Sequence, residues 1–225
     1  MPVSEVVLKN CGLFQRATPL VVKHAASQMD ILQLKKREVL LVNGRPFRGL
    51  GVVLQGRLQA MDYTIDGREV ALTTVDSGEA FGQANLIAPR PVDLTWVAVG
   101  QSTLAVMAPQ PAMELLRNSE MSMQVAVDLA QQVCEFLSWQ KILSVHPISA
   151  RVCAWLAWSA AGSQGLVIPR HAELAWRLGT TRESITRTFQ RLQSEKILRR
   201  EGENWLIENA AALQQMALGD SKGTE

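Results

Sequence analysis

The sequence of 225 residues predicts an α+β fold with an N-terminal antiparallel β-roll, a long helix and a C-terminal winged helix-turn-helix. Three observations predict it. In the first half, short runs rich in Val, Leu and Thr alternate with turn residues, which is typical of antiparallel strands. From about Ser119, apolar residues recur at helical spacing. After Pro169, two short helical segments flank a glycine-containing turn and precede two strand-like runs, which is typical of a winged helix-turn-helix.

The β-roll is expected from strand-like runs separated by turn residues. The runs are Glu38–Val42, Leu50–Leu54, Arg57–Tyr63, Glu69–Val75, Leu94–Val99 and Ser102–Ala108. Asp66-Gly67, between the third and fourth runs, is a strong hairpin signal. Several short strands at this spacing favour an antiparallel roll or barrel over a parallel sheet.

The long helix is expected to run from about Ser119 to His146, because the residue before Pro147 is disfavoured in the α region. Its apolar residues form two stripes. One, called the dimer stripe below, consists of Met123, Ala126, Val127, Ala130, Val133, Cys134 and Leu137. Small residues in this stripe permit close approach of a helix from a second copy of the chain. The other stripe, Leu129, Phe136 and Leu143, is expected to pack within its own domain. A helix packed wholly inside one chain is the alternative.

The helix-turn-helix is expected after an apolar helix at Ser149–Ala161 and a short strand at Leu166–Ile168. Its two helices are predicted at Arg170–Leu178 and Arg182–Glu195, with Gly179 in the turn between them. Thr181 is expected to cap the second helix. The residues expected to be buried between the helices are Leu174, Ala175, Leu178, Ile185, Phe189 and Leu192.

Basic residues concentrate in this segment. From Pro169 to Arg200 there are eight Lys and Arg against three Glu, a local net charge of +5 on a chain whose total is +2. Such a patch is typical of a surface that binds a polyanion, although a solvated helix face can also be basic. Because charge, spacing and a wing predicted from Leu198–Arg200 and Trp205–Ile207 agree, we predict that residues Ala172–Arg200 contact double-stranded DNA.

The N-terminal end of the second helix would enter the major groove, where arginine pairs with guanine and glutamate accepts from cytosine. Residues at this end are expected to contact or flank the bases: Thr181, Arg182, Glu183, Thr186 and Arg187. Phosphate contacts, which give affinity without sequence choice, are expected from Arg191, Arg199 and Arg200. We expect His171, at the start of the first helix, to face DNA or solvent.

The composition is that of an ordinary globular protein, with 47% hydrophobic and 20% charged residues. No apolar run reaches the ~18–20 residues that a membrane-spanning helix needs. The N-terminus lacks a basic segment followed by a sustained apolar one, so it does not resemble a signal peptide. We therefore expect a cytoplasmic protein without a membrane partner.

The three cysteines, Cys11, Cys134 and Cys153, are too widely spaced for a disulfide framework or a zinc knuckle. They are expected to be buried, reduced thiols. For Cys134 a cross-dimer disulfide or a thiol sensor is the alternative, and burial beside Val133 and Leu137 would make it inert. The sequence has no phosphate-binding loop, nucleophile elbow or zinc-protease motif, so an enzyme is not expected.

With these features the chain resembles the Crp/Fnr (cyclic-AMP receptor / fumarate–nitrate regulator) superfamily of bacterial transcription regulators over nearly its whole length. Residues 181–187, Thr-Arg-Glu-Ser-Ile-Thr-Arg, resemble the family's recognition-helix motif. The glycines that resemble the family's cyclic-nucleotide-binding β-roll are Gly44, Gly56, Gly67, Gly78 and Gly82.

The resemblance implies three parts: a sensor-like β-roll at 1–110, a linker and long dimerisation helix at 111–146, and a winged helix-turn-helix at 147–225. It also implies a homodimer that binds a palindromic operator and contacts RNA polymerase. The alternative is a cyclic-nucleotide-like or haem sensor module whose C-terminal domain mainly makes protein contacts.

The effector pocket that the resemblance implies is altered in this sequence. Cyclic-AMP binders of the family carry a Gly-Glu pair and then an Arg-Ser pair, whereas this chain has Gly82-Gln83 and then Asp93-Leu94. An aspartate in place of the phosphate-binding arginine repels the anion. Arg90 lies between prolines and is expected at a loop tip. A cyclic nucleotide is therefore disfavoured as the effector.

Two other sensing modes of the family are also disfavoured. An iron–sulfur cluster needs several N-terminal cysteines, and Cys11 is the only one there. A haem needs axial ligands near the pocket, and none of His24, His146 and His171 falls between residues 82 and 94. No cofactor is predicted, and the effector is left open.

Overall fold

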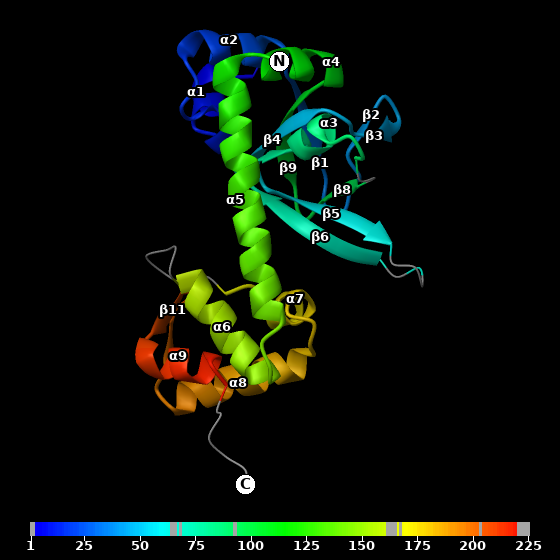
Figure 1. Ribbon diagram of the computed structural model, residues 1–225. Helices are drawn as coiled ribbons and strands as arrows, with labels where there is room; N and C mark the ends of the chain where they lie inside the picture. Colours follow the sequence, from blue (N-terminus) through cyan, green and yellow to red (C-terminus); the bar gives the residue numbers. More distant parts are fainter. Residues whose placement is uncertain are drawn as a thin grey trace. The chain divides into compact units, whose positions relative to one another are not determined.

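The computed structural model of the protein describes residues 3–63, 67, 69–91, 94–160, 166, 168–202 and 204–219. The chain divides into two compact units, Met1–Gln132 and Val133–Glu225. The division falls within the long helix α5 (Ser119–Leu143), and each unit has its own hydrophobic core. Figure 1 shows the elements in chain order.

Unit 1 contains the predicted β-roll. Its strands are β1 (Asp30–Leu34), β2 (Leu41–Val42), β3 (Arg45–Pro46), β4 (Leu50–Gln55), β5 (Arg57–Tyr63), β6 (Glu69–Asp76), β7 (Ala80–Phe81), β8 (Thr95–Ala98) and β9 (Ser102–Met107). They form a four-stranded sheet in the order β1-β9-β4-β7, a three-stranded sheet in the order β6-β5-β8, and the hairpin β2-β3. Every strand pairing among the described residues is antiparallel.

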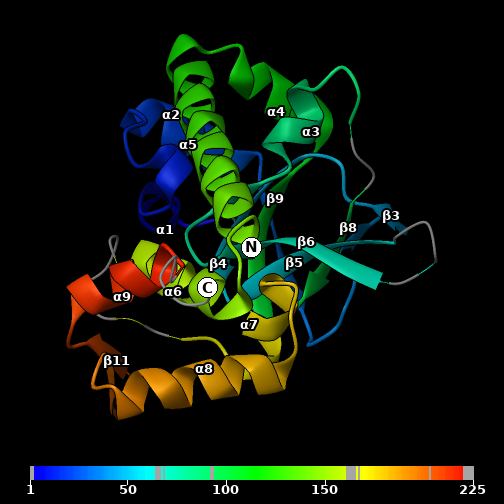
Figure 2. The same ribbon diagram turned by 60° about the horizontal axis from the view of Figure 1, so that its bottom comes forward.

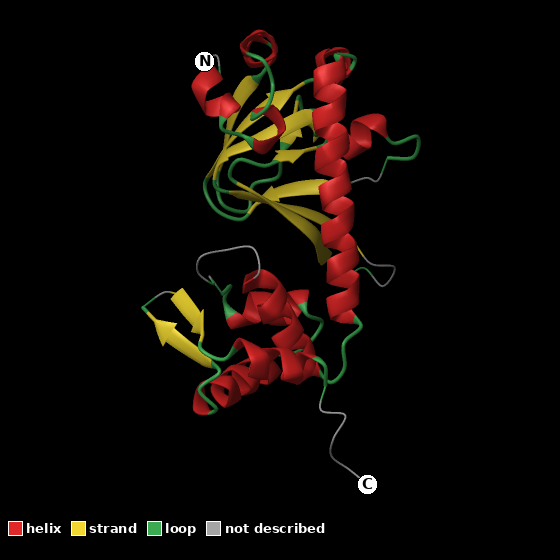
Figure 3. Ribbon diagram, turned by 60° about the vertical axis from the view of Figure 1, so that its left-hand side comes forward, coloured by secondary structure: helices red, strands yellow, loops and turns green. Residues whose placement is uncertain are grey.

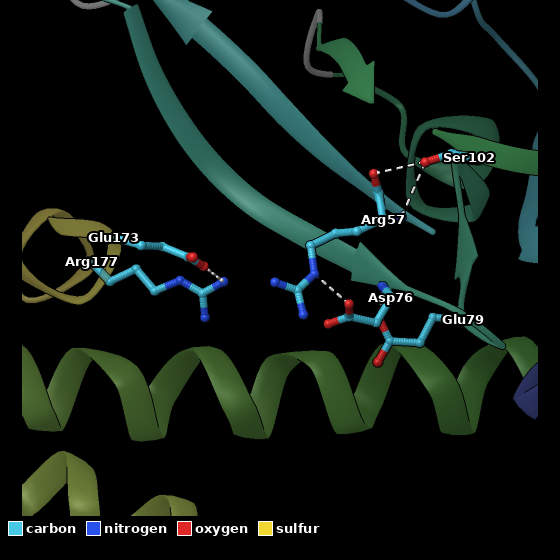
Figure 4. Close-up of polar contacts among 6 residues, drawn as sticks. All are labelled: Arg57, Asp76, Glu79, Ser102, Glu173 and Arg177. Atoms are coloured by element: carbon cyan, nitrogen blue, oxygen red, sulfur yellow. Dashed lines mark hydrogen bonds and ion pairs between the residues drawn. The ribbon is translucent and has the colours of Figure 1, made fainter. Parts of the chain in front are cut away.

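The hairpin of β5 and β6 follows the predicted pairing from Arg57 opposite Asp76 to Tyr63 opposite Glu69. Asp66, which was expected in its turn, lies outside the described residues. At the base of the hairpin, the Arg57 guanidinium donates to the Asp76 carboxylate, and the Ser102 hydroxyl oxygen accepts from the Arg57 backbone N–H at 3.2 Å (Figure 4). These contacts connect the start of β5 with β6 and β9.

Three aromatic rings pack against one another in the core between the two sheets. Phe81 lies between Phe47 and Trp96, with ring centroids 5.4 Å and 5.1 Å away, and all three are buried. Gly51 of β4 makes this possible, because a Cβ there would lie 2.1 Å from a Phe81 ring carbon. The outer face of β4 instead packs against helices through Leu50 and Val52.

The helices of unit 1 were not predicted, apart from α5. They are α1 (Glu5–Lys9), the 3-10 helix η1 (Gly12–Phe14), α2 (Pro19–Ser27), α3 (Gln83–Ile87) and α4 (Pro109–Leu116). Figure 1 shows α1, α2 and α4 near the N-terminal end of α5, and Figure 3 shows the roll strands beside the same part of that helix. Met121 and Val125 of α5 belong to the core that these helices form.

Unit 2 is the predicted winged helix-turn-helix. After the end of α5 it contains α6 (Ile148–Ala160), α7 (His171–Arg177), α8 (Arg182–Ser194), β10 (Leu198–Glu201), β11 (Asn204–Ile207) and α9 (Ala210–Ala217). All six residues expected between the two helices of the motif are buried, which confirms that prediction. Helix α9 was not predicted. Leu166, the first residue of the predicted strand Leu166–Ile168, forms a bridge with Trp205, and Val167 lies outside the described residues.

The surroundings of α5 correct three expectations. The helix ends at Leu143, not near His146, and Phe136 of the second stripe is 60% exposed. Cys134 is exposed, whereas Cys11 and Cys153 are buried as expected. Phe136 and Cys134 are exposed because no element of the described part of the chain covers residues 130–137. Burial raises the pKa of Cys153 to about 12 and also raises that of Cys11, so these two thiols are unreactive.

None of the helices in the described ranges combines the length and the apolarity needed to cross a membrane. The observed order of a β-domain, a long helix and a helix-turn-helix with a small β-wing confirms the predicted fold class.

Candidate nucleic-acid interface

The second helix of the motif, α8, begins at a side-chain cap. Thr181 has an extended backbone, and its hydroxyl oxygen accepts a hydrogen bond from the Ser184 N–H at 3.2 Å. Glu183 lies in the first turn, where a carboxylate interacts favourably with the helix dipole. Gly179, with φ of 61°, turns the chain back from α7. Cap and turn confirm the local predictions for this segment.

One face of α8 is buried in unit 2 and the other is open. Ile185, Phe189 and Leu192 are at most 1% exposed. On the opposite face, five side chains line a shallow hollow of about 340 Å³: Arg182, Glu183, Thr186, Arg187 and Gln190. Figure 2 shows α8 with α7 near one end and β11 near the other. Four of the five were predicted as base-contacting residues, and Gln190 was missed.

The predicted base-contacting charges are unpaired. Arg182, Glu183 and Arg187 are exposed and make no hydrogen bond or ion pair through their side chains within the described ranges. No ion pair with a described residue therefore has to break before these three groups contact a ligand.

The predicted phosphate-contacting arginines already have partners. Arg191 pairs with Glu195 at 2.7 Å, and Arg199 pairs with Glu208 at 2.7 Å. Arg200 donates to the Gly202 carbonyl at 3.0 Å and lies 5.9 Å from the centre of the Trp205 ring. Because exposed ion pairs are worth only ~0–1 kcal/mol, a phosphate group can replace the acids at little cost.

Arg177, a further basic residue of the segment, is not among the residues that line the hollow. It pairs with Glu173 at 3.1 Å along α7 (Figure 4). Its side chain and that of Glu173 are partly buried, so this pair belongs to the local structure of α7.

Thr186 is held by two hydrogen bonds inside the protein. Its hydroxyl donates to the Arg182 carbonyl at 2.9 Å and lies 3.0 Å from Nδ1 of His171. Since a hydroxyl has one proton, this arrangement makes the Nδ1–H of His171 the donor to Thr186. The hydroxyl oxygen keeps little capacity for a base, so the methyl group is the part of Thr186 available in the hollow.

His171 does not simply face solvent or DNA, as was expected. It is half-buried, and its ring packs on Phe189 with centroids 4.9 Å apart. Burial lowers the pKa of His171, and the positive charges of Arg182 and Arg200 lower it further. The contact between α7 and α8 that places His171 here spans 15 residues of sequence and has no local signal.

The wing is anchored to the same helix. β10 and β11 pair from Leu198 opposite Ile207 to Glu201 opposite Asn204. Trp205 packs edge-on against Phe189, with centroids 5.2 Å apart. The wing therefore shares the core that positions α8 and carries Arg199 and Arg200 on a defined strand.

The predicted effector pocket shows an unexpected carboxylate. Gln83 is 2% exposed, and its Nε2 donates to Oδ2 of Asp128 in α5 at 2.6 Å. Gln132 also donates to this oxygen, at 2.9 Å. Burial raises the pKa of Asp128, while the hydrogen bond from Gln83 lowers it. The two residues are 45 positions apart, so the sequence did not indicate their contact.

The other predicted pocket residues are Gly82, Arg90, Asp93 and Leu94. Gly82 adopts φ of 87° where α3 begins, and a Cβ there would lie 2.1 Å from the Gly49 carbonyl oxygen. Arg90 is exposed, and Asp93 lies outside the described residues. Leu94 lines a different hollow of about 670 Å³, whose wall includes Phe47 and whose lining does not include Gln83. In the described part of the chain, no three His, Cys, Asp or Glu side chains are grouped as a metal site.

Two family models match the chain. The model of the Crp-like helix-turn-helix domain matches residues 150–216, and the model of the cyclic nucleotide-binding domain matches residues 31–119.

Relatives resemble the chain along most of its length. It is 26% identical over 214 residues to the Cyclic AMP receptor protein of Thermus thermophilus, covering 94% of this chain and 99% of that protein. It is 27% identical over 170 residues to the Probable transcriptional regulator flp of Lacticaseibacillus casei, covering 74% and 78%.

Solved structures share the fold. FixK2 from Bradyrhizobium japonicum aligns with a TM-score of 0.66 and 16% identity, covering 84% of this chain and 96% of that one. A CooA variant from Carboxydothermus hydrogenoformans aligns with a TM-score of 0.69 and 16% identity, covering 96% and 97%.

Proposed function

Because the chain belongs to the Crp/Fnr family of DNA-binding transcription regulators, and not to an enzyme family, we propose that it works as a homodimer that binds a palindromic operator through α8 without control by cyclic AMP. The observation that carries the proposal is the exposed, unpaired set of Arg182, Glu183 and Arg187 on the open face of α8. RNA polymerase is the further partner that the family implies.

The chemistry of this set matches base edges in the major groove. An arginine donates to O6 and N7 of guanine in bidentate geometry, and a glutamate accepts from N4 of cytosine. Arg182 and Arg187 take the first role and Glu183 the second, with Thr181 and Thr186 at their flanks. Arg191, Arg199 and Arg200 neutralise phosphates, which adds affinity for every sequence.

The test of DNA recognition is a randomised-site selection with the purified protein, repeated at several salt concentrations. We expect one palindromic site to be enriched. Arg182→Ala and Arg187→Ala should each lose ~1–3 kcal/mol of binding free energy and relax the preference at one base pair per half-site.

Arg199→Ala is the matched comparison, because it should weaken binding to all sequences alike. Uniform loss in all three variants would show that the base-contacting face is misassigned. If no duplex is preferred under any condition, the C-terminal domain makes protein contacts instead.

The homodimer is supported by the exposed dimer stripe. Met123, Val133 and Leu137 are between 57% and 63% exposed on one side of α5. An apolar stripe of this kind is typical of an interface between copies of a chain, and Ala126 and Ala130 allow the helices to approach closely.

Independence from cyclic AMP is supported by Asp128. A phosphodiester beside Gln83 would meet a carboxylate that is already partly desolvated, in addition to the Asp93 substitution. The residues present therefore do not fit an anionic nucleotide. Isothermal calorimetry of the full chain with cyclic AMP should detect no binding at micromolar concentrations, whereas sub-micromolar affinity would contradict the proposal.

A further inference from the structure

Gln190 occupies the middle of the open face of α8. At 3.6 residues per turn, each residue rotates by about 100°, so Gln190 projects at about 80° from Arg182. Thr186 projects at about 40° and Glu183 at about 100° on the same scale. Gln190 therefore projects in a direction between those of Thr186 and Glu183, one to two turns closer to the C-terminal end of α8. It lines the same hollow as these two residues.

The side chain of Gln190 is available for a ligand. It is exposed, and its amide makes no hydrogen bond within the described ranges. The next residue, Arg191, projects about 100° away from it and is paired with Glu195. A neutral amide adds nothing to the electrostatic attraction between the protein and the phosphates, which Lys and Arg supply. Its place in the hollow, beside the proposed base-contacting residues, therefore favours a specific contact.

We propose that Gln190 is a base-contacting, specificity-determining residue that recognises adenine, outside the segment Thr181–Arg187. The amide of glutamine donates to N7 and accepts from the N6 amino group of adenine in bidentate geometry. Gln190 lies about 12 Å along the helix from Arg182, which is close to the ~12 Å width of the major groove. The inference rests on the proposed base contacts of Arg182 and Arg187.

The test compares full-length wild type with Gln190→Ala, Gln190→Glu and Gln214→Ala in randomised-site selection and competition binding. Gln190→Ala should reduce the preference for adenine at one base pair per half-site by about 5- to 150-fold and leave other positions unchanged. Gln190→Glu should move the preference at that base pair toward cytosine, because a carboxylate accepts from N4. Gln214, an exposed glutamine of α9, is the matched control and should behave as wild type.

Two outcomes overturn the inference. An equal loss of affinity for all sequences in Gln190→Ala would identify a phosphate contact, and an unchanged selected site would identify a bystander. Arg187→Ala, run in parallel, separates this inference from the proposed function. If Arg187→Ala reduces the preference at one base pair and Gln190→Ala does not, only the proposed role of Gln190 is contradicted. If Arg187→Ala also changes no base preference, the proposed base contacts are contradicted.

Discussion

Hydrogen bonding divides the polar side chains around α8 into two groups. Thr181 and Thr186 use their hydroxyls within the protein, one as the cap of the helix and the other between the Arg182 carbonyl and His171. Arg182 and Arg187 make no side-chain hydrogen bond or ion pair with the residues that the structure describes. The first group holds the helix in place. Under the proposed function, the second group exchanges water for bases without first breaking a contact within the described residues, which lowers the cost of specific binding.

Protonation of His171 is expected to destabilise unit 2 as the pH falls. Its pKa is lowered in the folded protein, so the folded state favours the neutral ring more than the unfolded chain does. The resulting stability is fully present above the usual value of ~6.5 and is lost as the pH falls through the lower, folded value. Thermal unfolding between pH 8 and 5 should show a larger loss for wild type than for His171→Gln, which retains a donor for Thr186 and does not titrate. Parallel curves for the two proteins would contradict this prediction.

At the scale of elements, α8 depends on contacts at both of its ends and along its buried face. The cap at Thr181 satisfies a backbone N–H that has no partner within the helix. Phe189 contacts His171 of α7 on one side and Trp205 of the wing on the other. The helix that carries the proposed base-contacting residues is therefore positioned by a helix before it and a strand after it.

Loss of the helix cap should lower the stability of the domain. Thr181→Ala is expected to lower the free energy of unfolding by about 1 kcal/mol, because the Ser184 N–H loses its acceptor. Thr181→Ser keeps the hydroxyl and should remain near wild type. Denaturant unfolding of the three proteins measures the difference, and an equal midpoint for Thr181→Ala and wild type would show that the cap contributes nothing.

At the scale of the whole molecule, two units with separate cores are joined through one continuous helix. The division between them falls inside α5, next to the exposed residues 130–137. A helix with this much uncovered apolar surface is stabilised when a second copy covers it. The proposed dimer interface therefore lies on α5, the same helix within which the two units of each chain are divided.

A charge in the dimer stripe should separate the copies. Leu137→Glu is expected to shift the protein from dimer to monomer in sedimentation at micromolar concentration, because two carboxylates would be buried at the interface. Affinity for a palindromic site should fall at least tenfold, while weak binding to a half-site remains. Gln131→Glu adds the same charge to the same helix outside the stripe and should stay dimeric. A Leu137→Glu protein that remains dimeric would place the interface elsewhere.

Features with local signals could be predicted from the sequence alone. Four such features depend on residues close together in the chain. They are the Thr181 cap, the left-handed backbone of Gly179, the bounds of β5, and the apolar spacing of Ile185, Phe189 and Leu192. The residue types on the open face of α8 also follow from helical spacing. This is why the fold class and the DNA-binding segment were predictable.

Features that depend on distant partners were decided by the tertiary structure. Strand β7 has two residues and exists through its pairing with Gly51 and Val52, and Gln83 meets Asp128 across 45 positions. What packs nearby decides three further features in the same way: the exposure of Cys134, the hydrogen bond of His171 to Thr186, and the ion pairs of Arg191 and Arg199. Arg182 has no such ion pair among the described residues. Local spacing determines which side chains share a face, but only packing decides which of them are covered, paired or left free to bind.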